Sequence, residues 1–287
     1  MNAVVSVQGL SKQYGSHVAL NNLNFEIPQG SVVGIIGPNG AGKTTALKAM
    51  LGLTSFSGSL QVLGRDPGKG RHRIMQDVCY ISDVGVLPRW LKVADALSYV
   101  EGVHPRFSRP RALELLGSTK IKMNSQIKDL SKGMVTQLHL ALVMSLDVSL
   151  LILDEPTLGL DIVYRKAFYD RLLADFVDET RSLVISTHQV EEIESLLTHL
   201  VFLNDGELVL ASRIEEMKQR FITLQVAPDK LEQARQLEPI GEQQLLGRWH
   251  LIFDSVPPEE LTTLGETRLT PIADLFVALV QLEKVND

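Results

Sequence analysis

The stretch SVVGIIGPNGAGKTTALKAMLGL, residues 31–53, decides the fold. Residues 31–36 form a short apolar run of the kind that makes a strand buried on both faces. A glycine-rich loop follows, and from Lys43 the apolar residues recur at helical spacing until Gly52, a residue typical of a helix end. A buried strand that passes through such a loop into a helix predicts an α/β fold with a parallel sheet.

The loop itself, GPNGAGKTT, fits the pattern G-x-x-x-x-G-K-[ST]. Glycines let backbone N–H groups approach phosphates, the helix start adds a positive dipole, and the lysine reaches the outer phosphates. We therefore expect nucleotide contacts from Gly37, Asn39, Gly40, Ala41, Gly42, Lys43, Thr44 and Thr45, with the Thr44 hydroxyl also on Mg²⁺. Kinases, switch GTPases and motor ATPases share this loop, so it does not specify the reaction.

Two further strands end in residues suited to phosphate chemistry. In LLILDEP, residues 150–156, the strand LLILD ends at Asp154 and Glu155 follows it, and SLVIST, residues 182–187, is followed by His188. In parallel sheets the carboxyl ends of the strands converge on one edge, where ligands bind. Asp154 then holds Mg²⁺, and Glu155 polarises the attacking water as general base. A histidine alone is more often structural than catalytic, but its place after this strand favours a functional role.

Patterns elsewhere complete the predicted architecture. Alternating residues 4–8 and 22–27 predict an antiparallel edge, and residues from about 75 to 145 are mostly helical in pattern. Residues 190–200 predict a helix, and 201–210 a hairpin whose turn is Asp205-Gly206. The chain is thus predicted to have a nucleotide-binding domain over 1–220 and a small α+β domain over 221–287.

Composition excludes several classes of protein. Of 287 residues, 45% are apolar and 22% charged, which is ordinary for a folded soluble protein. The lone Cys79 predicts no disulfide framework, and neither a signal sequence nor an apolar run of ~18 residues is found, so we expect a cytoplasmic protein. Residues 225–287 hold eleven acids and five bases and so carry the whole net charge of −6. That balance argues against a nucleic-acid partner.

A second motif, LSKGM at residues 130–134, raises a question. Ser131 is a good N-cap for the helical pattern that follows, and with Lys132 and Gly133 it forms a second anion-binding helix start. Taken alone it is better explained as an ordinary cap. One nucleotide does not need two phosphate sites, so the motif must be judged by the motifs around it.

The order of these motifs resembles the ABC-type ATPases, the nucleotide-binding subunits of ATP-binding-cassette transporters. The resemblance covers about residues 3–220 and rests on KQYGSHVAL, GPNGAGKTT, LSKGM, LLILDEPTLGLD and ISTH. It implies that Tyr14 stacks on adenine, that Asp161 closes the so-called D-loop, and that His188 is the switch histidine. The fold it implies is a P-loop ATPase core with a mostly parallel sheet, an antiparallel edge subdomain and a helical insertion.

The family resemblance also answers the question raised by LSKGM. In that family two subunits face head to tail, and each ATP is held between one phosphate loop and the other subunit's signature, here Ser131 and Gly133. The implied cofactors are ATP and Mg²⁺. The implied partners are a second ATPase subunit, identical or paired, and a multi-span permease, with the chain peripheral on the inner face of the cell membrane. By resemblance the expected direction of transport is export.

Two departures from the family pattern have consequences. Lys132 and Met134 replace a glycine and a glutamine of the usual signature, as in exporter-type subunits with separate membrane partners. Asp83 stands where the family commonly has a glutamine that contacts Mg²⁺. A carboxylate can still contact the ion, so we expect Asp83→Gln to retain most of the ATPase activity. Loss of turnover with intact ATP binding would contradict that equivalence.

Two interpretations stay open for residues 84–97, which carry Trp90. They form either the core of the helical subdomain or, by resemblance, the groove that receives a short coupling helix of the permease. For the whole chain the alternative is a soluble ABC-type ATPase of translation, DNA repair or regulation. Such proteins usually have two cassettes or a long coiled coil, which disfavours that class. A kinase would leave LSKGM and ISTH without a role.

Overall fold

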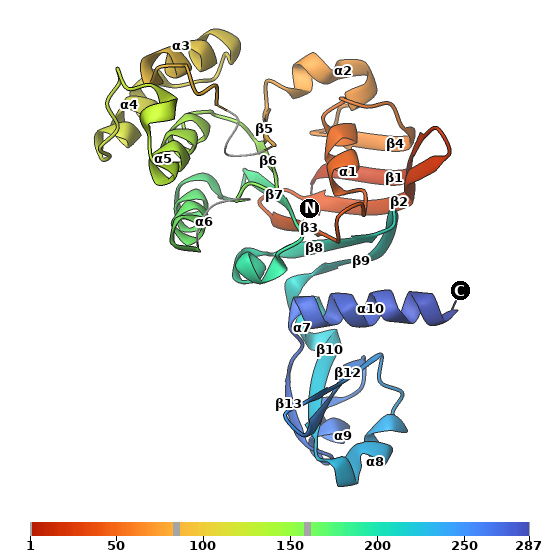
Figure 1. The fold of residues 1–287 in the computed structure, drawn as a ribbon. Coiled ribbons are helices and arrows are strands. Elements are labelled where there is room, and N and C mark those ends of the chain that lie inside the picture. The colour runs from red at the N-terminus through yellow and green to blue at the C-terminus, as the bar shows by residue number, and fades with distance from the viewer. Residues whose placement is uncertain (1, 83–86, 158–161, 287) are drawn as a thin grey trace.

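The computed structural model describes residues 2–82, 87–157 and 162–286, with side-chain detail for most of them. A central six-stranded sheet has the order β5-β6-β7-β3-β8-β9. Its strands are β3 (Val32–Ile36), β5 (Val78–Ile81), β6 (Leu150–Asp154), β7 (Ser182–Thr187), β8 (His199–Asn204) and β9 (Glu207–Arg213). All neighbours pair in parallel except β8 and β9, which form the predicted hairpin. The parallel α/β prediction is confirmed (Figure 1).

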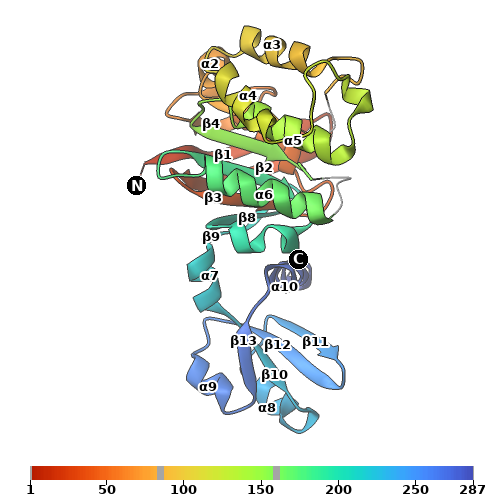
Figure 2. The same cartoon turned by 90° about the vertical axis from the view of Figure 1, so that its left-hand side faces the viewer.

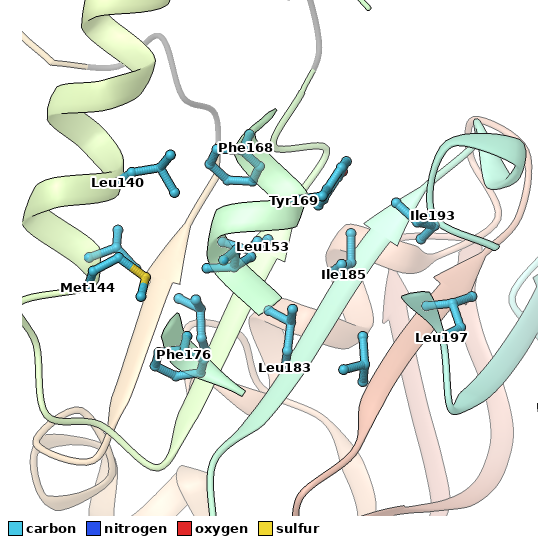
Figure 3. Packing of buried hydrophobic residues seen from close by; sticks show 14 of the residues in the cluster. Leu140, Met144, Leu153, Phe168, Tyr169, Phe176, Leu183, Ile185, Ile193 and Leu197 are labelled. Carbon is cyan, nitrogen blue, oxygen red and sulfur yellow. The ribbon is translucent and has the colours of Figure 1, made fainter. Parts of the chain in front are cut away.

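The middle strands of this sheet are buried on both faces. Every residue of β3, β6 and β7 is buried, as expected of parallel strands covered by other layers. On one face, α6 (Ile162–Phe176) lays Phe168, Tyr169 and Phe176 against Leu153 and Leu183 (Figure 3). This packing fixes the carboxyl ends of β6 and β7, from which Asp154, Glu155 and His188 extend.

A second layer covers the opposite face. The antiparallel sheet has the order β2-β1-β4, formed by β1 (Ala3–Tyr14), β2 (His17–Pro28) and β4 (Ser57–Val62). Helix α1 (Lys43–Met50) shares one hydrophobic cluster with this sheet and with the other face of the central strands. The predicted antiparallel edge is therefore present, and α2 (Pro67–Ile74) connects β4 to β5.

The helical insertion is shorter than the predicted range of 75–145. Its helices are α3 (Val93–Val103), α4 (Arg109–Gly117) and α5 (Lys132–Val143), with a 3-10 turn, η1 (Ile127–Asp129). Residues 78–81 instead form the edge strand β5, because this short apolar run pairs with β6 along its whole length.

The prediction of an α-helix over residues 190–200 is wrong. The segment contains two 3-10 turns, η2 (Val190–Glu192) and η3 (Glu194–Leu196), and β8 then begins at His199. Ile193 between the turns has φ −120°, which breaks the helix. Val190, Ile193 and Leu197 are nevertheless buried, so the apolar spacing reflects successive turns that face the core.

Residues beyond Arg213 form a further layer. After α7 (Ile214–Arg220), a four-stranded antiparallel sheet has the order β11-β12-β10-β13. Its elements are β10 (Phe221–Val226), η4 (Pro228–Lys230), α8 (Leu231–Arg235), β11 (Gly241–Leu245), β12 (Arg248–Asp254), α9 (Pro258–Thr262) and β13 (Glu266–Leu269). Leu224, Leu251 and Leu261 belong to a separate hydrophobic cluster between this sheet and α8 and α9.

The last helix, α10 (Ile272–Asn286), lies between this sheet and the rest of the chain. Figures 1 and 2 both place it below β8 and β9 and above β10 and β12. Its buried residues Ile272, Leu275 and Ala278 belong to the main cluster that α6 and the central sheet also share. The two layers are therefore packed together through α10.

Candidate nucleotide site

The phosphate loop is held tightly against its surroundings. A Cβ on Gly37 would lie 2.2 Å from the carbonyl oxygen of Leu203, so no larger residue fits. Gly42 has φ 97° and a Cβ there would lie 2.6 Å from the carbonyl oxygen of Ala19. Gly42 is also the N-cap of α1, and no side chain caps that helix. The first N–H groups of α1 are therefore available to an anion at the loop.

Lys43 places its ammonium group within the loop. Its side chain is 6% exposed, and Nζ donates to the carbonyl oxygens of Gly37 at 2.7 Å and Pro38 at 3.1 Å. Nζ also lies 3.6 Å from Glu155 Oε1. Burial lowers the pKa of Lys43, while the carboxylates of Glu155 and Asp154 oppose that shift. The loop thus holds a desolvated cation that a phosphate oxygen can approach.

Asp154 collects hydroxyl groups from three elements. Its Oδ1 accepts from Thr44 Oγ1 at 3.2 Å and from Ser186 Oγ, and its Oδ2 accepts from Tyr80 at 3.3 Å. Burial and the neighbouring Asp154 raise the pKa of Tyr80 to about 12, so the phenol stays a donor. Carboxylate and hydroxyl oxygens are the ligands that Mg²⁺ prefers. The Thr44 and Asp154 pair fits such an ion.

Glu155 joins the ends of β6 and β7. Its Oε1 lies 2.9 Å from His188 Nδ1, and its N–H donates to the carbonyl oxygen of Ser186 at 3.0 Å. Glu155 has φ 51°, a backbone conformation that costs a non-glycine residue about 1 kcal/mol. The Glu155 carboxylate lies next to both His188 and Lys43. The predicted convergence of Gly37, Asp154 and His188 on one sheet edge is confirmed.

The LSKGM segment forms the predicted helix start. Ser131 is the N-cap of α5, and its Oγ accepts from the Met134 N–H at 3.3 Å. Ser131 is exposed, whereas Gly133 is buried. Helix α5 packs into the cluster on one face of the central sheet and α1 into the cluster on the other. Within one chain the two anion-binding helix starts therefore belong to different faces.

Other predicted residues are placed as follows. Asn39 and Gly40 are exposed in the loop, Ala41 is buried, and Thr45 is half-buried in the first turn of α1. Tyr14 ends β1 with its ring 47% exposed, and Lys12 Nζ lies 4.7 Å from the ring centroid. Asp83 and Asp161 lie outside the described residues.

Sequence reasoning missed the polar partners of these groups. Ser186 and Tyr80 both bond Asp154, and both lie at the ends of strands that flank β6. A polar residue near the carboxyl end of an apolar strand was the signal that could have identified them. Thr157 and Arg165 contact Glu192 beyond His188, and no local pattern indicates those pairs.

A groove of about 610 Å³ lies between β5 and the helical insertion. It is lined by Cys79, Tyr80, Ile81, Ser82, Leu87, Pro88, Trp90, Leu91, Ala96, Tyr99, Val100, His139, Leu142, Val143 and Leu146. Trp90 is 72% and Tyr99 67% exposed, whereas Val93 and Leu97 are fully buried. Val93 and Leu97 therefore belong to the core of the helical subdomain, as the first interpretation expects, whereas Trp90 lines an open apolar groove.

Known proteins resemble this chain in sequence and in fold. The sequence model of the family described as "ABC transporter" matches residues 20–158. The "Nod factor export ATP-binding protein I" of Cupriavidus metallidurans is 32% identical, over 84% of this chain and 83% of that protein. The "Bacitracin transport ATP-binding protein BcrA" of Bacillus licheniformis is 30% identical, over 77% of this chain and 73% of its own. A solved structure described as "Structure of ATP binding subunit of ABC transporter" has a TM-score of 0.67 and 25% identity, and covers 75% of this chain and 92% of its own.

The fold and the site define a P-loop ATPase whose sheet edge carries a general-base candidate and a histidine. The chain belongs to the family of ABC transporter ATP-binding subunits. It binds ATP and acts as the ATPase of a transporter. Among residues 2–82, 87–157 and 162–286, no helix is long and apolar enough to cross a membrane.

Proposed function

We propose that this chain drives export through a separate multi-span permease, and that ATP-dependent closure of an ATPase dimer supplies the force. The domain over 1–220 binds and hydrolyses ATP, and residues 221–287 form an added domain. This direction is supported by the relatives from Cupriavidus metallidurans and Bacillus licheniformis, which are named for export and for transport, respectively. The transported compound is selected by the permease.

Glu155 is the proposed general base for the attacking water. Its carboxylate is partly exposed and stands beside Lys43, which binds the outer phosphates. His188, 2.9 Å from Glu155, orients that carboxylate and contacts the γ-phosphate region. The contact between Glu155 and His188 is the single observation that carries this assignment.

Asp154 and Thr44 would hold Mg²⁺, with Asp83 as a further ligand. When bound, the ion neutralises charge that develops on the phosphates. In this chain Ser186 and Tyr80 hold the Asp154 carboxylate by hydrogen bonds to both of its oxygens. They are positioning residues for the metal ligand.

Two chains form each working unit. The loop residues Gly37 to Thr45 of one chain and Ser131 and Gly133 of the other bind the same ATP, with Tyr14 stacked on adenine and Asp161 at the interface. The packing of α1 and α5 into hydrophobic clusters on opposite faces of the sheet is consistent with this arrangement. Loss of the γ-phosphate removes the shared contact and opens the dimer.

The groove beside Trp90 is the proposed docking site for the permease. Its lining is mostly apolar and includes exposed aromatic rings, which are typical of anchor sites for a partner helix. The chain would then be peripheral on the inner face of the cell membrane. A soluble ATPase of translation, DNA repair or regulation is the alternative class.

Purification of the tagged chain from detergent-solubilised membranes of its own cell tests the proposal. We expect a stoichiometric multi-span partner, and we expect Trp90→Glu to lose that partner while keeping ATP binding. Recovery only in the soluble fraction, with ribosomal or DNA-bound proteins, would favour the alternative class.

A further inference from the structure

The segment that follows His188 is tied to the segment that follows Glu155. Arg165 of α6 donates from Nη1 to Gln189 Oε1 at 2.9 Å and forms an ion pair with Glu192. The buried Thr157 donates to Glu192 Oε2 at 3.4 Å. Both proposed catalytic side chains are therefore followed by residues of one polar network.

Helix α10 supports the same segment from the other side. The Ile272 N–H donates to Glu194 Oε1 at 3.3 Å. In β8, the strand that follows this segment, the ring of Phe202 meets that of Phe276 edge to face, with centroids 5.1 Å apart. The buried residues of α10 share one cluster with those around η2 and η3, namely Ile272, Leu275, Ala278, Val190, Ile193 and Leu197.

Helix α10 also rests on the C-terminal sheet. A Cβ on Gly241 of β11 would lie 2.7 Å from the Ala278 Cβ, so strand and helix are in close contact. Ile252 of β12 also belongs to the cluster that contains Ile272 and Leu275. Residues 221–287 therefore reach the His188 segment through one helix.

The His188 segment has little regular structure of its own. Its two 3-10 turns have three residues each, and such short turns have poor hydrogen-bond geometry. Segments of this kind are held mainly by their tertiary contacts. Without α10, the turn η2 would lose the helix that it packs against, and the position of His188 would be less well fixed.

We propose that α10 is a positioning element for His188, and that residues 221–287 thereby set the rate of ATP hydrolysis. The inference rests on the role proposed above for His188. A displacement of about 1 Å in a reacting group can lower a rate by up to ~100-fold, so a modest loosening of η2 and η3 would be measurable. ATP affinity should change little, since the phosphate loop lies in the other cluster.

A matched pair of variants in the full chain tests this role. Leu275 and Leu261 are both fully buried leucines of residues 221–287, but only Leu275 belongs to the cluster that contains the His188 segment. We expect Leu275→Ala and Leu261→Ala to lower the melting temperature by similar amounts. Only Leu275→Ala should lower kcat, by about three- to tenfold, with the KM for ATP within about twofold. Hydrogen exchange over residues 188–197 should speed up in that variant alone.

Two further variants keep the test decisive. Phe276→Leu serves if Leu275→Ala does not fold. It removes the ring contact with Phe202 but keeps an apolar side chain, so it should fold and show a smaller fall in kcat. Equal kcat and equal exchange over 188–197 in Phe276→Leu, Leu261→Ala and the unchanged chain would overturn the inference. His188→Ala in the same assay separates the two levels: turnover retained in it removes the proposed role of His188. Turnover lost in it, with α10 variants unaffected, removes only the role of α10.

Discussion

At the scale of the single residue, Glu155 has the most constrained position in the site. Its φ of 51° is unfavourable for a side chain with a Cβ, and such strain concentrates where function requires it. The carboxylate meets His188 at 2.9 Å and Lys43 at 3.6 Å. Its charge would also repel a γ-phosphate, so the residue proposed to promote hydrolysis would also oppose ATP binding.

Glu155→Gln separates those two effects. The amide keeps the size of the side chain but cannot take a proton, so turnover should fall by at least ~100-fold. ATP binding should persist, because the negative charge beside the phosphates is removed, and the ATP-bound chain should accumulate as a dimer. Turnover of radiolabelled ATP and gel filtration with ATP measure the two effects. Normal turnover would exclude Glu155 as the base.

Lys43→Ala should act on binding instead. The ammonium is the positive charge of the loop, and the carbonyl groups left behind in the variant cannot neutralise a phosphate. We therefore expect ATP affinity to fall by about 10- to 100-fold. Titration calorimetry with ATP measures the change. Lys48→Ala is the control, because Lys48 is an exposed lysine of the same helix. Equal affinities in the two variants would contradict the phosphate-loop assignment.

At the scale of the element, the strands that are fully buried were predictable from the sequence, and the exposed strands were not. The fully buried strands β3, β6 and β7 end within a residue of the predicted bounds, because a short apolar run has few other ways to be covered. Strand β11 has no buried residue and β13 only one that is half-buried, so neither shows the alternation by which strands are recognised. Their pairing is set by β12 and β10.

The site divides in the same way. Residues at strand ends were predictable because a parallel sheet brings those ends together. The partners of Asp154 and the contacts of Glu192 were not, because they join side chains far apart in the sequence. The left-handed Glu155 also leaves no trace in residue order.

The junction between α7 and β12 gives a prediction of pH dependence. Arg220 donates from Nε and Nη2 to the two Asp254 oxygens, each at 2.7 Å. The Arg220 hydrogen bonds, with one from Ser255, lower the pKa of Asp254. A carboxyl whose folded pKa is depressed stabilises the fold above its unfolded pKa of about 3.9, and that stability is lost as pH falls through the folded pKa.

Asp254→Asn should therefore lower the free energy of unfolding by about 1 kcal/mol at pH 7, the upper range for a solvent-accessible pair. The difference should vanish in strong acid. Calorimetric unfolding at pH 7 and below pH 4 measures it, with Glu215→Gln as control because that carboxylate is 83% exposed and lies 3.7 Å from Arg213. A difference between Asp254→Asn and the unchanged chain that is the same at every pH would rule out the ionised pair as its source.

At the scale of the whole molecule, we expect the two anion-binding helix starts of one chain to bind different ATP molecules. Helix α1 belongs to the cluster with the antiparallel sheet, and α5 to the cluster with α6. In a symmetric dimer, a twofold axis would place the signature of each chain opposite the phosphate loop of the other, which gives two equivalent ATP sites. Each catalytic site would then contain Lys43 of one chain and Ser131 of the other.

Mixing two inactive variants tests this composite site. Lys43→Ala disables the phosphate loop, and Ser131→Arg blocks the signature without touching the loop, so each variant alone should be inactive. In a mixed dimer one site carries both defects and the other carries neither. Random mixing makes about half of the dimers mixed, so if the sites act independently the ATPase rate should recover to about a quarter of that of the unchanged chain. If each site were complete within its own chain, both variants would stay inactive after mixing, and mixing would add nothing.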